Sequence, residues 1–188
     1  MQGPDGAIAA AGHPFLTHLA EQLEGGAVHE AMHNLCLWLR CQKIARPIEQ
    51  WSALASDCVK HPITTLLHQD PLTRRTFQKP KGYAGDATML DLIYSREDDT
   101  FLPSFANPMT EAIFRYTASA PASRAVCVRR QIIARLIDQV AGQTAYPRIL
   151  SIAAGHLRET ALSQAVREGR IKELIALDQD EESLATIT

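Results

Sequence analysis

Hydrophobic residues in the first two thirds of the chain are spaced three to four positions apart, as on one face of a helix. Leu16, Leu19 and Leu23 begin this pattern, and a glycine pair at 25–26 ends it. Similar runs predict further helices that begin near Val28, Pro47, Pro62, Ala87 and Pro108. We therefore expect a helical N-terminal region over 14–120, behind a frayed start at 1–13.

The clearest helix is predicted over residues 122–141. Four apolar residues at intervals of four, with Ile133 and Ile137 beside them, would form a broad apolar stripe: Val128, Ile132, Leu136 and Val140. Gly142 is expected to cap this helix. Residues 68–86 contain two prolines and two glycines, so we expect an ordered loop there.

The pattern changes after Pro147. A short apolar run over 149–153 ends at Gly155, and a second run over 173–177 ends at Asp178. A helix is predicted between them over 157–168, and another begins over 183–187. This order is a βαβ unit with two parallel strands. The predicted class is α/β, with a helical N-terminal region followed by the start of a Rossmann-like domain over 121–188.

Composition narrows the classes of function. The net charge is −2, and 46% of residues are hydrophobic, which is ordinary for a globular protein and gives no reason to expect nucleic acid as a partner. No apolar stretch is long enough for a membrane span, and no signal peptide is recognisable, so we expect a cytoplasmic protein. The four cysteines form no C-x-x-C pair and are expected to be buried, reduced thiols.

The ends of the two predicted strands carry the candidate chemistry. Ala153, Ala154 and Gly155 would let a ligand approach the backbone of the first strand end closely. Asp178 ends the second strand and could accept hydrogen bonds from the hydroxyls of a ribose. These two ends are 23 positions apart, near the spacing of about 20 residues expected for a nucleotide site. One glycine in place of three disfavours a pyrophosphate and favours a nucleoside such as S-adenosylmethionine.

The segments ILSIAAGHLRET and ELIALDQDEESLA look like motifs I and II of class I S-adenosylmethionine-dependent methyltransferases. KPKGYAGD at 79–86 and GHLRE at 155–159 resemble a bacterial family that makes 3-hydroxypalmitic acid methyl ester, a quorum-sensing signal. The resemblance covers roughly residues 60–188. It implies S-adenosyl-L-methionine as cofactor and a small methyl acceptor such as a 3-hydroxy fatty acid, whose carboxylate needs no general base.

By position, the resemblance also implies roles for residues. Ala153, Ala154 and Gly155 would pass under the cofactor, Asp178 would hold its ribose, and Gln179 would lie beside the adenine.

Further residues would meet the methionine end of the cofactor. Glu159 and Arg158 would bind it or brace the loop, and Tyr83 and Asp86 would lie over the sulfonium. Two alternatives stay open. Tyr83 and Asp86 could form a turn with a helix N-cap, and His156 could be a cofactor contact or a packed histidine. The resemblance identifies no catalytic residue.

A class I methyltransferase core has seven strands, and this sequence carries motifs of two. We therefore expect the front part of a longer protein, inactive alone or completed by homodimerisation over the open sheet edge.

Two other functions compete with this interpretation. His29-Glu30-x-x-His33 matches the H-E-x-x-H pattern of zinc hydrolases, but the sequence offers no third ligand motif, and we expect the chain to hold no metal. The N-terminal helices could instead form a non-catalytic interaction or regulatory module.

Overall fold

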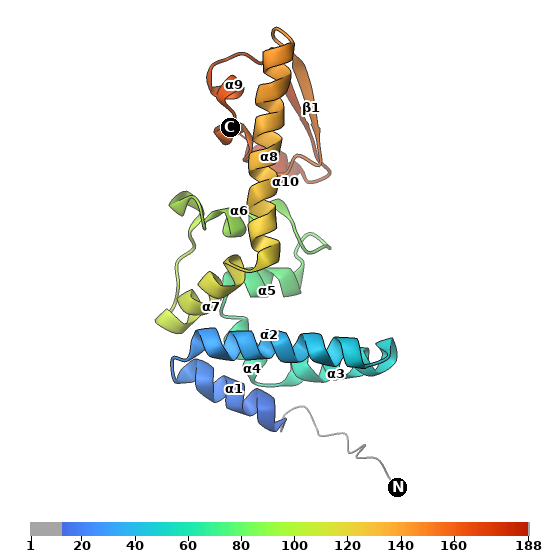
Figure 1. The fold of residues 1–188 in the computed structure, drawn as a ribbon, viewed down its shortest axis with the longest axis vertical. Helices are drawn as coiled ribbons and strands as arrows, with labels where there is room; N and C mark the ends of the chain where they lie inside the picture. The colour runs from blue at the N-terminus through green and yellow to red at the C-terminus, as the bar shows by residue number, and fades with distance from the viewer. Residues whose placement is uncertain (1–12, 188) are drawn as a thin grey trace. The chain divides into compact units, whose positions relative to one another are not determined.

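The computed structural model describes residues 13–187 and divides into two compact units. Unit 1 comprises residues 13–74 and 103–117, and unit 2 comprises 75–102 and 118–187. Figure 1 shows the order of the elements along the chain. The division differs from the expected boundary at 120/121, because residues 75–102 pack with the C-terminal part of the chain.

Unit 1 is helical, as the hydrophobic spacing predicts. Its elements are α1 (Pro14–Glu24), α2 (Val28–Ala45), α3 (Ile48–Lys60), α4 (Ile63–Leu67), the start of α5 (Pro71–Gln78) and most of α7 (Pro108–Ala118). Leu16, Leu19 and Leu23 of α1 are each at most 2% exposed. They form one core with residues of α2, α4 and α7, so burial of the periodic leucines explains why these short helices are stable together.

Unit 2 contains a small parallel sheet with helices around it. Its elements are the end of α5, α6 (Ala87–Tyr94), η2 (Asp99–Phe101), α8 (Pro121–Gln143), β1 (Arg148–Ile152), η3 (Thr160–Leu162), α9 (Gln164–Arg167), β2 (Glu173–Leu177) and α10 (Glu181–Ala185). The two strands are in parallel register from Arg148 opposite Glu173 to Ile152 opposite Leu177. The mixed α/β class and the parallel strand pair are therefore confirmed.

The apolar stripe predicted for the long helix faces the core only along the edge formed by Ile137, which is buried, and Ile133, which is half-buried. Val128, Ile132, Leu136 and Val140 are 41–53% exposed, whereas the buried side of α8 includes Cys127, Ala134 and Ile137. Gly142 lies within α8, which ends at Gln143, so the predicted glycine cap is wrong.

Two predicted segments also differ from the structure. Residues 68–86 are not all loop, because α5 forms within them after Asp70, whose carboxylate accepts the N–H groups of Leu72 and Thr73. The continuous helix over 157–168 is replaced by η3 and α9. Leu157 has a positive φ of 54°, which interrupts a helix, and Ser163 caps a new one.

The cysteines only partly match the expectation of burial. Cys127 is buried, Cys58 is half-buried, and Cys36 and Cys41 are exposed; all four are free thiols. Among the helices of the described residues, none combines the length and the apolar character needed to cross a membrane.

Candidate functional site

Asp178 joins the carboxyl ends of the two strands. Its Oδ2 accepts the backbone N–H of Gly155 at 2.8 Å, and its Oδ1 accepts the N–H of Asp180 at 2.9 Å. The N–H of Ala154 adds a bond of 3.1 Å to the carbonyl of Leu177. An ionised carboxylate has about four acceptor positions, so each oxygen of Asp178 can accept one further hydrogen bond, for example from a hydroxyl group.

Gly155 occupies a position that favours glycine for two reasons. Its φ is +53°, and a Cβ there would lie 3.2 Å from the Cβ of Ala87. Ala153 and Leu157 also have positive φ values, of 55° and 54°. Residues 153–157 therefore form a tight turn at the end of β1.

A cavity opens at this end of the sheet. It has a volume of about 560 Å³ and is lined by Tyr83, Ile152, Ala153, Leu177, Asp178 and Gln179. We call it the Asp178 cavity. Its volume lies in the range of about 300–1,000 Å³ that small-ligand sites occupy, and mostly apolar walls with few polar groups are also typical of them. The structure thus brings four predicted site residues together from three separate segments: Tyr83, Ala153, Asp178 and Gln179.

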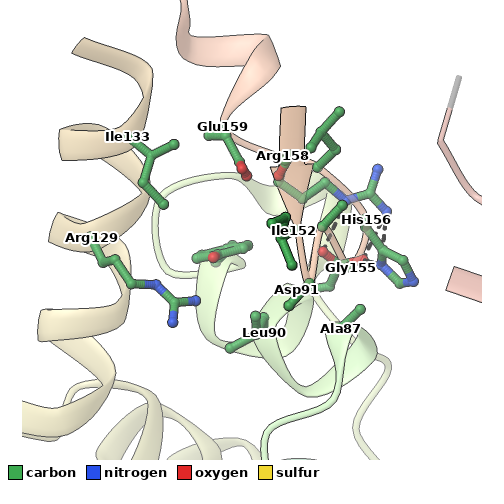
Figure 2. Close-up of a pocket in the computed structure, with 15 residues that line it drawn as sticks. Ala87, Leu90, Asp91, Arg129, Ile133, Ile152, Gly155, His156, Arg158 and Glu159 are labelled. Carbon is green, nitrogen blue, oxygen red and sulfur yellow. Dashed lines mark hydrogen bonds and ion pairs between the residues drawn. The ribbon is translucent and has the colours of Figure 1, made fainter. Parts of the chain in front are cut away.

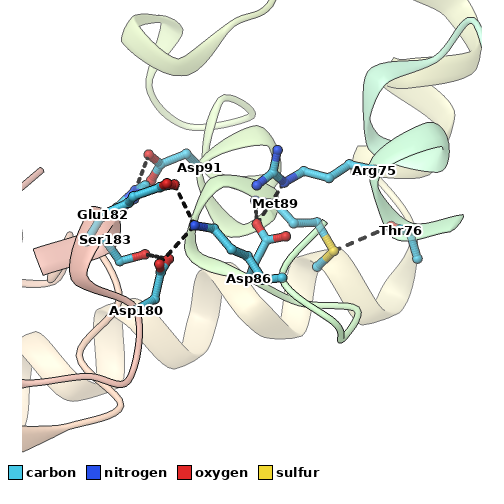
Figure 3. Close-up of polar contacts among 10 residues, drawn as sticks. Arg75, Thr76, Asp86, Met89, Asp91, Asp180, Glu182 and Ser183 are labelled. Atoms are coloured by element: carbon cyan, nitrogen blue, oxygen red, sulfur yellow. Dashed lines mark hydrogen bonds and ion pairs between the residues drawn. The ribbon is translucent and has the colours of Figure 1, made fainter. Parts of the chain in front are cut away.

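Lys81 fastens the 79–86 segment beside the Asp178 cavity. Its Nζ lies 2.9 Å from Oδ1 of Asp180 and 2.5 Å from Oε2 of Glu182, both just after β2 (Figure 3). Hydrogen bonding to Asp180, and then to Glu182, raises the pKa of Lys81 to about 12. The bond to Lys81 lowers the pKa of Asp180 in turn. Sequence reasoning missed this contact, although a basic segment and an acidic D-Q-D-E-E segment were both visible.

Asp86 is a helix cap and does not line the Asp178 cavity. It is 2% exposed, its Oδ1 accepts the N–H of Met89 at 2.9 Å, and the same oxygen lies 2.7 Å from Nε of Arg75 (Figure 3). The structure therefore agrees with the alternative of an N-cap at Asp86, and the expected position over a sulfonium is not supported. Tyr83, from the same segment, does reach the Asp178 cavity.

His156 and Arg158 share one partner on α6. The Asp91 carboxylate lies 2.7 Å from Nδ1 of His156 and accepts two hydrogen bonds from Arg158, at 2.9 and 2.8 Å. Hydrogen bonding to Asp91 raises the pKa of Arg158, and its guanidinium also lies 4.8 Å from the ring centre of Phe101. These contacts support the alternatives of a packed His156 and a bracing Arg158. Asp91 was not predicted from the sequence.

A second cavity lies between α6, α8 and the turn after β1 (Figure 2). It has a volume of about 310 Å³, and its lining includes Leu90, Tyr94, Arg129, Ile133 and Glu159. We call it the Arg129 cavity. Ala154, Gly155 and His156 also line it, and Ile152 and Ala153 line both cavities. Of the predicted site residues, Glu159 therefore lies in this cavity and not beside Asp178.

The histidines of the H-E-x-x-H pattern do not form a metal site with other residues. The ring of His29 packs edge-on against Tyr116, with ring centres 5.3 Å apart. Within residues 13–187, no group of three or more His, Cys, Asp or Glu side chains is arranged to hold a metal ion. The structure gives the zinc hydrolase alternative no support.

Comparison of this chain with protein-family models, with curated proteins and with solved structures gives no match. The methyltransferase resemblance therefore depends on the motif residues themselves and stays a prediction.

Proposed function

We propose that unit 2 binds S-adenosyl-L-methionine in the Asp178 cavity and takes part in transferring its methyl group to a small molecule. The observation that carries this proposal is the position of Asp178. The carboxylate sits at the carboxyl end of a parallel strand, is fixed by two backbone N–H groups, and keeps acceptor capacity toward an open cavity.

The chemistry of the cavity fits a nucleoside. Vicinal ribose hydroxyls are two donors, which suits a carboxylate with free lone pairs. Ile152 and Leu177 provide apolar surface for an adenine ring, and Gln179 can hydrogen-bond its edge. Tyr83 presents an aromatic ring, which attracts cations such as a sulfonium.

When bound, the sulfonium supplies an electrophilic methyl group. The residues of the chain would then position the ligand and exclude water rather than move a proton, because a carboxylate acceptor is already ionised at neutral pH. A 3-hydroxy fatty acid is the acceptor that the family resemblance suggests.

The test is calorimetric titration of the whole chain with S-adenosylhomocysteine. We expect binding by the wild type, a loss of affinity of about tenfold or more in Asp178→Asn, and a weaker loss in Tyr83→Leu. Glu181→Gln is the matched control, because Glu181 is an exposed carboxylate on α10 that does not line the cavity. Tyr83→Leu separates binding from folding, because Tyr83 is 39% exposed. If wild type binds no S-adenosylhomocysteine, the proposal is wrong.

A further inference from the structure

The exposed side of α8 carries a half-exposed row of aliphatic side chains. Its members follow one another at intervals of four, so they form a continuous edge of the helix over about 18 Å. Each of them is 41–53% exposed. We call this row the α8 ridge: Val128, Ile132, Leu136 and Val140. Single exposed apolar side chains are ordinary on a protein surface, whereas a continuous row of them indicates an interaction surface.

Three exposed arginines border the α8 ridge. Arg124 lies one turn before Val128. Arg129 and Arg135 lie on opposite sides of the ridge, because the first follows position 128, the second precedes position 136, and each residue advances the helix by about 100°. Among the ion pairs that the described residues form, none includes any of these three arginines.

The helix itself offers no free carboxylate to balance these charges. Asp138 is the single acidic residue of α8, and its Oδ1 accepts hydrogen bonds from Oγ of Ser163 at 2.6 Å and from the N–H of Ala165 at 2.8 Å. The fourth arginine of α8, Arg130, is buried and paired with Glu97 at 3.0 Å. The exposed side of α8 is therefore apolar along its middle and positive at its borders.

This pattern is complementary to the surface of an anionic lipid bilayer. Aliphatic side chains can enter the boundary between headgroups and acyl chains, and an arginine can bury its stem there while its guanidinium stays among the headgroups. A second copy of the chain fits less well, because two helices packed ridge to ridge would bring like charges together. Protein partners usually bind through aromatic anchors, and the ridge contains none.

We propose that the α8 ridge binds the surface of membranes that contain anionic phospholipids, with α8 parallel to the bilayer plane. The aliphatic side chains enter the bilayer boundary, and the guanidinium groups of Arg124, Arg129 and Arg135 pair with lipid phosphates. The inference is independent of the proposed function, because no residue of the ridge lines the Asp178 cavity.

The experiment is flotation of the whole chain with two kinds of vesicle, one made of equal parts phosphatidylglycerol and phosphatidylcholine and the other of phosphatidylcholine alone. Leu136→Gln alters the ridge, and its control is Leu102→Gln, at a leucine 39% exposed in the same unit. Arg135→Gln removes a bordering charge, and its control is Arg96→Gln, at an exposed arginine outside α8. Circular dichroism verifies that these surface variants are folded.

We expect wild type to float with the anionic vesicles and not with phosphatidylcholine alone, and added salt to weaken the binding. Leu136→Gln and Arg135→Gln should each weaken it by about fivefold, and the two controls by less than about twofold. Equal effects of ridge variants and controls, equal flotation with both vesicles, or no flotation would each overturn the inference. A dimer in light scattering that Leu136→Gln dissociates would assign the ridge to a second copy and overturn it as well.

Discussion

Asp91 on α6 accepts two hydrogen bonds from the guanidinium of Arg158, at 2.9 and 2.8 Å, across 67 positions of sequence. The side chains are 14% and 25% exposed, so the pair is largely shielded from solvent. It joins the helix that begins at Ala87 to the turn that follows β1. The pair therefore holds α6 against the turn after β1, and both of its side chains line the Arg129 cavity.

Asp91→Asn removes the charge that holds this contact, so Arg158 loses its ionic partner and His156 loses the carboxylate that contacts its Nδ1. We expect the free energy of unfolding to fall by about 1–3 kcal/mol, as for a hydrogen-bonded charge left unpaired. Urea denaturation followed by circular dichroism measures the change. Asp99→Asn is the control, because Asp99 is exposed within the same unit, and we expect it to alter stability by less than about 0.5 kcal/mol. Equal effects of the two variants would show that the Asp91 contact contributes nothing.

Gly155→Ala tests the turn after β1. We expect destabilisation of about 1–2 kcal/mol from the left-handed backbone, and about 1 kcal/mol or more in addition from crowding against Ala87. Gly169→Ala isolates the first effect, because Gly169 has a φ of +66° but no atom within 4 Å of an added Cβ.

Adding Ala87→Gly to Gly155→Ala should recover the crowding contribution alone, which a double-mutant cycle of unfolding free energies would reveal. Strictly additive effects would contradict the close approach of these two residues.

The Lys81 contacts predict a characteristic pH dependence. The pKa of Lys81 is raised from 10.5 to about 12, so its contribution to stability is complete below pH 10.5 and is lost as the pH rises through 12. The pKa of Asp180 is lowered from 3.8, so its contribution is present above pH 3.8 and is lost as the pH falls further. The difference in unfolding midpoint between wild type and Lys81→Met should be constant near neutral pH and shrink at both extremes. A difference that grows on acidification would contradict the pairing.

His61 in unit 1 should make stability sensitive to mild acid. It is 3% exposed, its Nδ1 accepts the N–H of Ile63, and its Nε2 lies 3.3 Å from Oγ1 of Thr17. Burial lowers its pKa, and the neighbouring His13 lowers it further. The folded state therefore favours neutral His61, and stability should fall as the pH drops below 6.5 toward the lower folded value.

In His61→Gln, the unfolding midpoint should depend less on pH between about 6.5 and 5 than in wild type. The control His33→Gln changes an exposed histidine and should keep the wild-type slope. A wild-type slope in His61→Gln would rule out His61 as its source.

The strands and most helices of this protein are readable from the sequence, because local spacing determines them. The predicted strand 173–177 coincides with β2, and the first strand differs by one residue. The apolar stripe predicted for α8 is buried only in part, at Ile137 and Ile133, and there is a physical reason. The apolar stripe of α8 was visible in the sequence. The face that is buried also includes small side chains such as Cys127 and Ala134, and its choice depends on the neighbouring elements.

The residues of the candidate site could be predicted from the sequence only where they directly follow a strand. Asp178 and Ala153 follow from the βαβ order and Gln179 from the family resemblance, and the structure places all three around one cavity. Asp91 lies on α6, directly after the 79–86 segment, and Arg129 lies on α8, outside both motifs; only the tertiary arrangement brings them to the turn after β1. The sequence left two roles open for Asp86, because a carboxylate before a helix can bind a ligand or cap that helix and residue spacing does not distinguish the two; the structure shows the cap.

The bond between the Gly155 N–H and Asp178 has a consequence for how occupancy of the site can be observed. The amide proton of Gly155 is protected from exchange with solvent only while the two strand ends are closed. A ligand that binds this closed arrangement must slow the exchange of that one proton, in proportion to its concentration relative to its dissociation constant. The hydrogen-exchange rate of the Gly155 amide would therefore report ligand binding without any measurement of catalysis.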